Sequence, residues 1–255
     1  MSARIDLNAD LGEGFGPWRT GDDAALLDIV TSANVACGFH AGDPDIMVET
    51  AVAAKARGVA IGAHPGFPDL RGFGRNRIQE SPKRIERDIA YQIGALRACA
   101  ALAGARVTHV KAHGALANLS NEDEAVAEAL ARAVAGVDRS LALVVMPGLP
   151  AERAGERAGL TLVREIYADR AYAEDGTLAP RGSTGAVIHD AEEAAARVVR
   201  MARESAVFTS SGRRLPVAID TVCVHGDNPE ALAMARAVRA GLERAGFSLR
   251  PFAES

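Results

Sequence analysis

Short apolar runs rich in β-branched residues alternate along the chain with longer segments of helical periodicity. Near-continuous apolar runs are typical of strands buried on both faces, as in parallel sheets. The sequence predicts about seven such strands, at Arg4–Asn8, Ser32–Ala36, Val59–Ala63, Val107–Lys111, Leu141–Met146, Leu160–Ile166 and Ile219–Val224.

Helices are predicted between these strands from their first residues and their apolar faces. A capping Asp, Asn or Ser followed by Pro at the first helical position is a start signal. Such starts occur at Asp43-Pro44 before Ile46–Arg57, at Ser81-Pro82 and at Asn228-Pro229. We expect Asp190 to cap a helix over Ala191–Arg203 and Asn121 to cap one over Glu122–Val134.

The regular alternation of strand and helix, without a linker-like break, predicts a single α/β domain over residues 1–255 with right-handed crossovers. Two architectures fit this order: a distorted parallel (β/α) barrel and a doubly wound open sheet. In an open sheet the ligand-binding residues gather at one switch point, whereas in a barrel they follow many strands. Polar residues follow nearly every predicted strand, so we expect the barrel.

Composition and charge exclude several classes of protein. The net charge is −4 and the Lys and Arg residues form no cluster, which argues against nucleic-acid binding. Three scattered cysteines argue against a disulfide framework and favour a reducing compartment. The first residues lack the pattern of a signal peptide, and no run approaches the roughly 18 apolar residues of a membrane span. We expect a cytoplasmic protein with no membrane partner.

The first predicted turn concentrates carboxylates and glycines. Residues 6–16 read DLNADLGEGFG, which places Asn8, Asp10 and Glu13 at the end of a strand. Carboxylates there can act as a general base or as ligands of a cation. A plain helix-capping turn is the alternative, but so many charges at one strand end are costly unless they are used.

Most histidines of the chain lie at or just beyond the predicted strand ends. They are His40, His64, His113, His189 and His225, whereas His109 lies within a strand. Imidazoles act as general acids and bases near neutral pH or as metal ligands. A single histidine is more often structural. We expect at least two of these to be functional, because four of them have a Gly or Pro one or two positions later in the chain.

Basic residues supply the complementary charge. Lys111 ends a buried strand, where it can hold an anionic group or, with a depressed pKa, donate a proton. Arg170 and Arg181 lie in the long loop Tyr167–Gly185 and suit carboxylates or phosphates. We interpret Cys37 and Cys223 as small buried residues rather than nucleophiles.

Seven motifs in order resemble the LamB/YcsF family over residues 6 to about 250. They are DLNADLGEGFG (6–16), NVACGFHAGDP (34–44), GAHPGFPDLRGFGR (62–75), VKAHGALAN (110–118), ADRAY (168–172), APRG (179–182) and VCVHGDNP (222–229). The family pattern VKPHGALYN is changed here at Ala112 and Ala117, which leaves Lys111 and His113 intact.

The resemblance implies a distorted barrel of the glycoside hydrolase/deacetylase class. It implies the A subunit of a bacterial ATP-dependent 5-oxoprolinase, which opens 5-oxo-L-proline to L-glutamate together with B and C subunits. ATP, with Mg²⁺, is the implied co-substrate. A metal-dependent carbohydrate deacetylase or amidohydrolase, or a non-catalytic subunit that positions substrate, are the alternatives.

Roles follow from this reaction as hypotheses. We expect catalysis by Asp10, His64, Lys111 and His113. Asp10 or His64 would be the base for water, Lys111 and Arg170 would hold phosphoryl oxygens, and His113 or His225 would be the acid for the ring nitrogen. The expected substrate-binding residues are Asn8, Glu13, His40, Asp43, Arg170, Arg181, His225 and Asp227. A site-bound divalent metal would use Asp10, His40 and His64.

Overall fold

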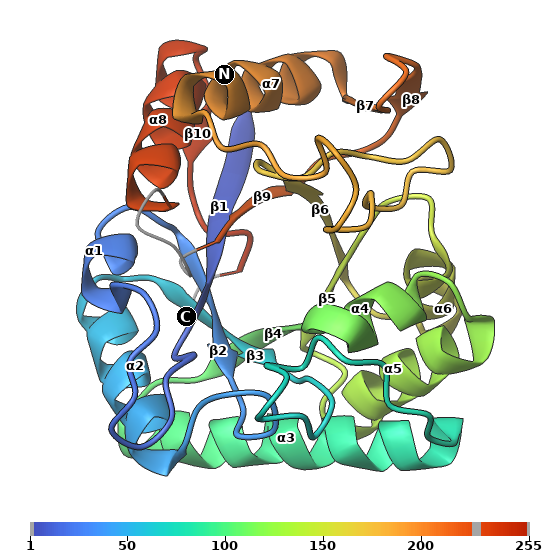
Figure 1. Ribbon diagram of the computed structural model, residues 1–255. Coiled ribbons are helices and arrows are strands. Elements are labelled where there is room, and N and C mark those ends of the chain that lie inside the picture. Colours follow the sequence, from blue (N-terminus) through green and yellow to red (C-terminus); the bar gives the residue numbers. More distant parts are fainter. Residues whose placement is uncertain (1–2, 226–230, 254–255) are drawn as a thin grey trace.

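The computed structural model describes residues 3–225 and 231–253. In this part of the chain seven parallel strands close into a barrel, which Figure 1 views along its opening. They are β1 (Arg4–Leu11), β2 (Ser32–Ala36), β3 (Ala60–His64), β4 (Val107–Lys111), β5 (Ala142–Val145), β6 (Leu162–Tyr167) and β9 (Thr221–Val224). The pairing of β9 with both β6 and β1 closes the ring, which confirms the predicted barrel over the open sheet.

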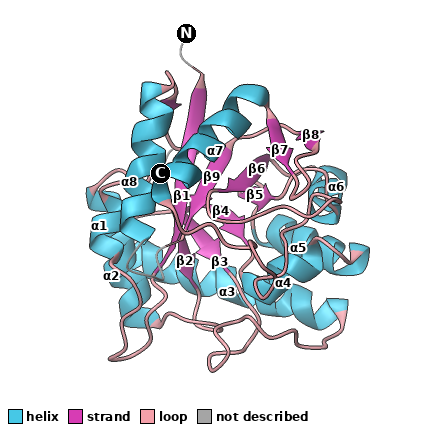
Figure 2. Cartoon of the chain, turned by 45° about the horizontal axis from the view of Figure 1, so that its top comes forward, coloured by secondary structure: helices cyan, strands magenta, loops and turns pink. Residues whose placement is uncertain are grey.

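Helices surround the strands on the outside of the barrel, as Figure 2 shows. They are α1 (Asp23–Leu27), α2 (Pro44–Ala56), α3 (Pro82–Leu102), α4 (Gly114–Ser120), α5 (Glu124–Val137), α6 (Pro150–Ala158), α7 (Ala191–Glu204) and α8 (Ala231–Arg244). Two small additions complete the described part: β10 (Ser248–Leu249) pairs with the start of β1, and β7 (Ala206–Phe208) forms a hairpin with β8 (Arg214–Pro216).

The two faces of β1 separate the hydrophobic core from the interior of the barrel. Leu7, Ala9 and Leu11 belong to the buried cluster that packs against the helices. Asp6, Asn8 and Asp10 alternate with them, because successive strand residues point to opposite faces, and contact side chains of other strands. The barrel interior is therefore polar at this strand.

Most of the predicted helix starts are confirmed, and one is wrong. The carboxylate of Asp43 and the hydroxyl of Ser81 cap α2 and α3, and Asp190 caps α7. Asn121 does not cap α5, since it ends α4, and Asp123 instead accepts hydrogen bonds from the first turn. The expected start at Asn228-Pro229 lies outside the described residues.

Gly62 on β3 makes room for a side chain from the neighbouring strand. A Cβ at this glycine would lie 2.1 Å from the ring of His109 on β4. The ring crosses this gap and places Nε2 3.1 Å from the Asn34 amide oxygen, and burial lowers the pKa of His109 to about 3. His109 is thus a neutral structural residue that links β2 to β4.

Gly62→Ala should therefore lower the free energy of unfolding by about 1–3 kcal/mol, because the ring of His109 must move. Urea unfolding measures this change. Gly94→Ala is the matched control: this glycine lies in α3, an added Cβ would meet nothing within 4 Å, and stability should rise by about 0.5–1 kcal/mol. Equal stability of the Gly62 variant and the original chain would contradict the close-packing explanation.

Candidate active site

The C-terminal ends of the strands carry a buried network of charged groups centred on Lys111. Its ammonium lies 3.0 Å from Asp10 Oδ1, 2.9 Å from Glu165 Oε1 and 3.0 Å from Cys223 Sγ. Burial alone would lower the pKa of Lys111, but the two carboxylates outweigh it and raise that pKa well above its ordinary value. Lys111 is thus a fixed cation rather than a proton donor.

Asp10 is the carboxylate of this network that also reaches the imidazoles. Its Oδ1 accepts a hydrogen bond from Asn34 at 2.9 Å, and its Oδ2 lies 3.3 Å from His64 Nε2. Burial would raise the pKa of Asp10, but its contacts with His64 and Lys111 hold it well below its usual range. Asp10 therefore stays ionised, with one oxygen held and the other facing His64.

Three imidazoles gather beside Asp10 on the ends of β3 and the loops that follow β2 and β4. His113 Nδ1 lies 3.0 Å from His64 Nε2 and 3.4 Å from Glu13 Oε1. The ring of His40 stacks on that of His113, with centroids 3.7 Å apart and 4° between the planes. Burial lowers the pKa values of His40 and His113 well below the ordinary value, and burial raises that of Glu13.

Asp10 and the three imidazoles form one wall of the site, and the wall opposite them carries positive charge. His225, which follows β9, lies 2.8 Å from Asp169 Oδ2 through Nδ1, and this carboxylate raises the pKa of His225 despite burial. Arg170 is 7% exposed and donates to the carbonyl oxygen of Ala179 at 2.6 Å, while its Nε has no hydrogen-bond partner in the described part of the chain. Burial and the like charge of Arg181 lower the pKa of Arg170.

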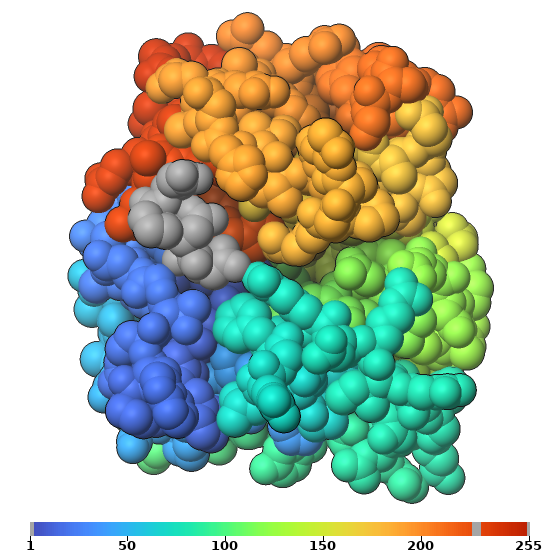
Figure 3. Space-filling view, in the orientation of Figure 1, coloured from blue at the N-terminus to red at the C-terminus, as the bar shows by residue number. Residues whose placement is uncertain are grey.

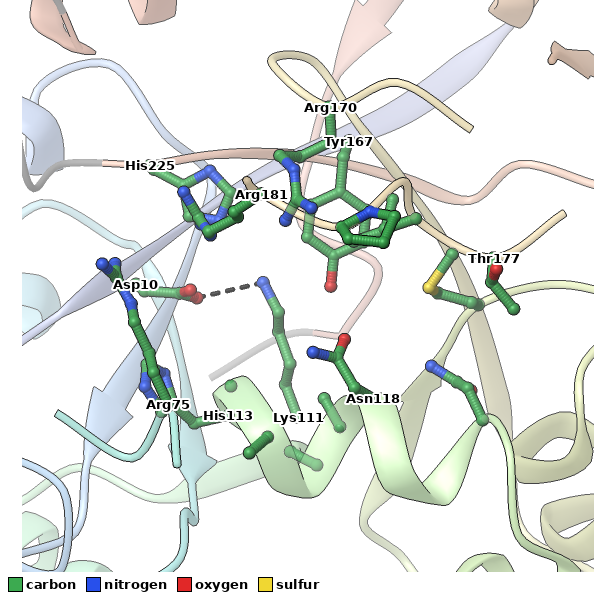
Figure 4. A pocket seen from close by; sticks show the side chains of 18 of the residues that line it. Asp10, Arg75, Lys111, His113, Asn118, Tyr167, Arg170, Thr177, Arg181 and His225 are labelled. Carbon is green, nitrogen blue, oxygen red and sulfur yellow. Dashed lines mark hydrogen bonds and ion pairs between the residues drawn. The ribbon is translucent and has the colours of Figure 1, made fainter. Parts of the chain in front are cut away.

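A cavity of about 520 Å³ lies between these two walls. Figure 4 shows Asp10 and Lys111 facing each other on its floor, with Arg170, Arg181 and His225 on the far side. In Figure 3 the surface is hollowed between the segment that follows β3 (teal) and the one that follows β6 (gold). The segment between β3 and α3 and the long loop after β6 therefore border the cavity.

The structure brings most of the sequence-predicted site residues together. The cavity is lined by Asp10, Glu13, His64, Lys111, His113, Arg170, Arg181 and His225. Asn8 and His40 lie behind this surface, since Asn8 bonds to Lys111 at 3.3 Å and His40 stacks on His113. Asp43 caps α2 and also accepts from the amide of Gly16 at 2.7 Å. Asp227 lies outside the described residues.

Other residues of the cavity were not singled out by sequence reasoning. Among them are Arg75, Asn118 and Tyr167. Arg75 is the last residue of the motif GAHPGFPDLRGFGR, and Tyr167 follows the predicted end of its strand by one residue. Asn118 lies on α4, a helix whose seven residues show no clear periodicity.

Carboxylates and imidazoles lie at the C-terminal rim of a closed parallel (β/α) barrel, the rim at which enzymes of this fold carry their active sites. The catalytic domain of a peptidoglycan N-acetylglucosamine deacetylase from Eubacterium rectale ATCC 33656 shares the fold, with a TM-score of 0.51 at 12% identity over 99% of this chain and 90% of that one. The sequence profile of the LamB/YcsF family matches residues 5–255, and the chain belongs to this family.

Relatives within the family are similar over almost the whole chain. A protein of Gluconobacter oxydans that is named as the A subunit of 5-oxoprolinase is 56% identical, over 98% of this chain and 99% of that protein. The crystal structure of a lactam utilization protein from Thermus thermophilus is 47% identical, with a TM-score of 0.92 over 98% of this chain and all of that one. No helix in the described part of the chain combines the length and the apolar character of a bilayer span.

The buried carboxyl group of Asp6, at the base of the polar interior, should make the stability of the fold depend on pH. It accepts hydrogen bonds from Thr31 and Ser32 at 2.6 Å and from Thr221, yet burial raises its pKa from 3.8 to about 6. The folded chain therefore holds a proton that the unfolded chain releases. The resulting stabilisation is fully present below about pH 4 and is lost as the pH rises through about 6.

Asp6→Asn should remove this loss of stability with rising pH. Relative to the original chain, the variant should gain about 2–3 kcal/mol of unfolding free energy between pH 4 and pH 7. Urea unfolding at several pH values measures the difference, with Glu80→Gln, an exposed residue, as the control that shows no such gain. A difference that stays constant with pH would contradict a raised pKa for Asp6.

Proposed function

We propose that this chain is the catalytic A subunit of an ATP-dependent 5-oxoprolinase. The reaction opens 5-oxo-L-proline to L-glutamate and releases ADP and phosphate, in a complex with B and C subunits. The names of the Gluconobacter relative and of the Thermus structure support the reaction. The observation that supports the catalytic role is the cavity between an ionised Asp10 and two arginines that form no ion pair in the described part of the chain.

The chemistry requires activation of a stable five-membered amide. Transfer of the terminal phosphoryl group of ATP to the carbonyl oxygen forms an O–P bond and releases ADP. Water then adds to the ring carbon, and the C–N bond breaks as the nitrogen takes a proton, which leaves an acyl phosphate. A second water hydrolyses this to the carboxylate of glutamate and free phosphate.

Asp10 is the base in this scheme. It remains ionised at neutral pH, its Oδ1 is held by Lys111 and Asn34, and its Oδ2 is the oxygen left to accept a proton from water. His225 suits the acid that protonates the ring nitrogen, because Asp169 raises its pKa. His113 suits that role less, since burial keeps its imidazole neutral.

Arg170 and Arg181 form the phosphoryl subsite. Neither guanidinium forms an ion pair in the described part of the chain, although Arg170 is almost fully buried, and the carboxylate of Asp169 acts on both at longer range. Two guanidinium groups lie at the same cavity, and Nε of Arg170 has no hydrogen-bond partner in the described part of the chain. An anion that accepts hydrogen bonds from both groups would stabilise them. A phosphoryl group supplies the oxygen acceptors for this fork.

The direct test mixes the chain with its B and C partners, 5-oxoproline, ATP and Mg²⁺ and measures glutamate and phosphate together. Equal production of the two supports the proposal. Glutamate without ATP consumption would favour a simple amidohydrolase. A complex whose turnover survives every cavity substitution would make this chain a substrate-positioning subunit. Calorimetric titration of the isolated chain with ATP and Mg²⁺ shows whether the nucleotide binds here or needs the partners.

Asp10→Asn should lower kcat in this complex at least about a hundredfold, because the base and part of the charge field of Lys111 are lost. Asp43→Asn is the matched control, since it changes a carboxylate outside the cavity but keeps a side chain that caps α2. Normal turnover of the Asp10 variant, or an equal loss in both variants, would remove Asp10 from the scheme.

Arg170→Gln should separate ATP use from ring opening. With the phosphoryl subsite weakened, glutamate formation should fall about 10–100-fold, the effect of losing one charged hydrogen-bonding group. Phosphate released per glutamate should then rise above one. Arg77→Gln is the control, because this arginine of the cavity rim is already paired with Glu122 at 2.6 Å. An unchanged ratio and rate in the Arg170 variant would contradict the subsite.

A further inference from the structure

The hydrogen bonds of two cavity imidazoles, those of His64 and His113, indicate which nitrogen of each ring carries the proton. His64 Nδ1 lies 2.8 Å from the carbonyl oxygen of Lys111, and His113 Nε2 lies 2.8 Å from that of Phe73. A carbonyl oxygen only accepts, so both of these ring nitrogens carry protons. The other two nitrogens, His64 Nε2 and His113 Nδ1, face each other at 3.0 Å, and the carboxylate oxygen Oδ2 of Asp10 lies 3.3 Å from His64 Nε2. In neutral rings both are acceptors, and they need a positive centre between them.

Glu13 adds a third donor atom at the same point. Its Oε1 lies 3.4 Å from His113 Nδ1, and the ligand atoms of Glu13, His64 and His113 all lie within 4.8 Å of one another. Tetrahedral ligands with bonds of roughly 2.0–2.1 Å are separated by roughly 3.3 Å. The 3.0 and 3.4 Å separations lie on either side of this value, so one ion fits between them.

The surroundings of these groups match those of metal ligands. A metal-bound imidazole usually donates its other N–H to a carbonyl or carboxylate, and both His64 and His113 do so. Glu13 is held by His40 Nε2 at 3.3 Å. His40 Nδ1 has no partner in the described part of the chain, which places the ring proton on Nε2 as the donor to Glu13.

His40 itself is not a fourth ligand. A metal ion lies in the plane of each imidazole that binds it, and the rings of His40 and His113 are stacked with only 4° between their planes. An ion in the plane of His113 therefore lies outside the plane of His40. Glu13, His64 and His113 line the cavity whereas His40 lies behind it, so a fourth position would open to the cavity. Three protein ligands with one open position are typical of catalytic zinc sites.

A second group of donor atoms, from Asp10, Cys223 and His225, is a poorer site. The ammonium of Lys111 lies 3.0 Å from both Asp10 Oδ1 and Cys223 Sγ. This fixed positive charge repels a cation and already neutralises Asp10. The first group has no ammonium or guanidinium hydrogen-bonded to its ligand atoms in the described part of the chain.

We propose that Glu13 Oε1, His64 Nε2 and His113 Nδ1 bind one divalent ion of the zinc class, with its fourth position open to the cavity. This ligand set differs from the expected Asp10, His40 and His64, of which only His64 remains. An ion at this site would leave Asp10 as the base for water, because both ring nitrogens of a metal-bound His64 are occupied. The site follows from donor geometry alone and does not depend on the reaction proposed above.

The experiment titrates the isolated, chelator-treated chain with Co²⁺ at pH 7.5, without lactam, ATP or partner subunits. We expect a visible absorption band of tetrahedral intensity that saturates at one equivalent and disappears when Zn²⁺ is added. Elemental analysis of the dialysed protein counts the ion. Since no turnover is measured, this result is independent of whether the chain is a 5-oxoprolinase.

Variants locate the ion. Glu13→Gln, which keeps the shape of the side chain, and His113→Ala should each weaken Co²⁺ binding at least about a hundredfold, and His40→Gln about 10–100-fold through the loss of its contact to Glu13. His225→Gln is the matched control and should bind as the original chain does. Thermal unfolding verifies that each variant is folded.

Two results would overturn the proposal. One is the absence of Co²⁺ and Zn²⁺ binding by the folded original chain, which would leave a shared proton between His64 and His113. The other is loss of binding in the His225 variant with retention in the Glu13 and His113 variants, which would place the ion at Asp10, Cys223 and His225. A strong thiolate-to-cobalt band would mark that second case.

Discussion

The contact of the Lys111 ammonium with two carboxylates is the interaction on which the rest of the site depends. Lys111 ends β4 and is 3% exposed, while Asp10 reaches it from β1 and Glu165 from β6. An unpaired buried ammonium costs several kcal/mol, so the three strand ends are held at the distances that satisfy it. The same contact keeps Asp10 ionised, and it thereby sets the charge on the floor of the cavity.

The polar interior below Lys111 extends this constraint along the barrel. Asn8 donates to Glu165 at 3.0 Å and to Thr221 at 2.7 Å, and it accepts from Asn34 at 2.7 Å. A buried polar network stabilises one arrangement only when each member has its partners, and this one has them on four strands. The ordinary (β/α) barrel fills its interior with branched apolar side chains. Here part of that volume holds the polar groups that fix the positions of Asp10 and Lys111, at the cost of apolar packing.

The fold could be read from the sequence because strand and helix signals are local, whereas the site could be read only in part. The histidines after the strands and the carboxylates of the first turn indicated one rim. The separate roles of His40 and His113 could not be predicted, since they depend on the stacking of two rings from distant segments. Asn121 was misassigned because α4, which it ends, has only seven residues. Asp43 shows the opposite case: its capping signal was visible, and the structure places it at α2 rather than in the cavity.

The distribution of charge over the elements separates two tasks of the site. Asp10 and Glu165 lie on barrel strands, where backbone pairing on both sides prevents displacement of a base from the atom it serves. Arg170 and Arg181 lie on a long loop, anchored through the bond from Arg170 to Ala179 within the same loop. The loop is also tied to the strand ends, since the hydroxyl of Tyr172 accepts from the amide of Tyr167 at 2.9 Å and Asp169 Oδ2 lies 2.8 Å from His225 Nδ1. The proposed base is therefore positioned by backbone pairing, whereas the arginines of the proposed phosphoryl subsite are positioned by side-chain contacts of their loop.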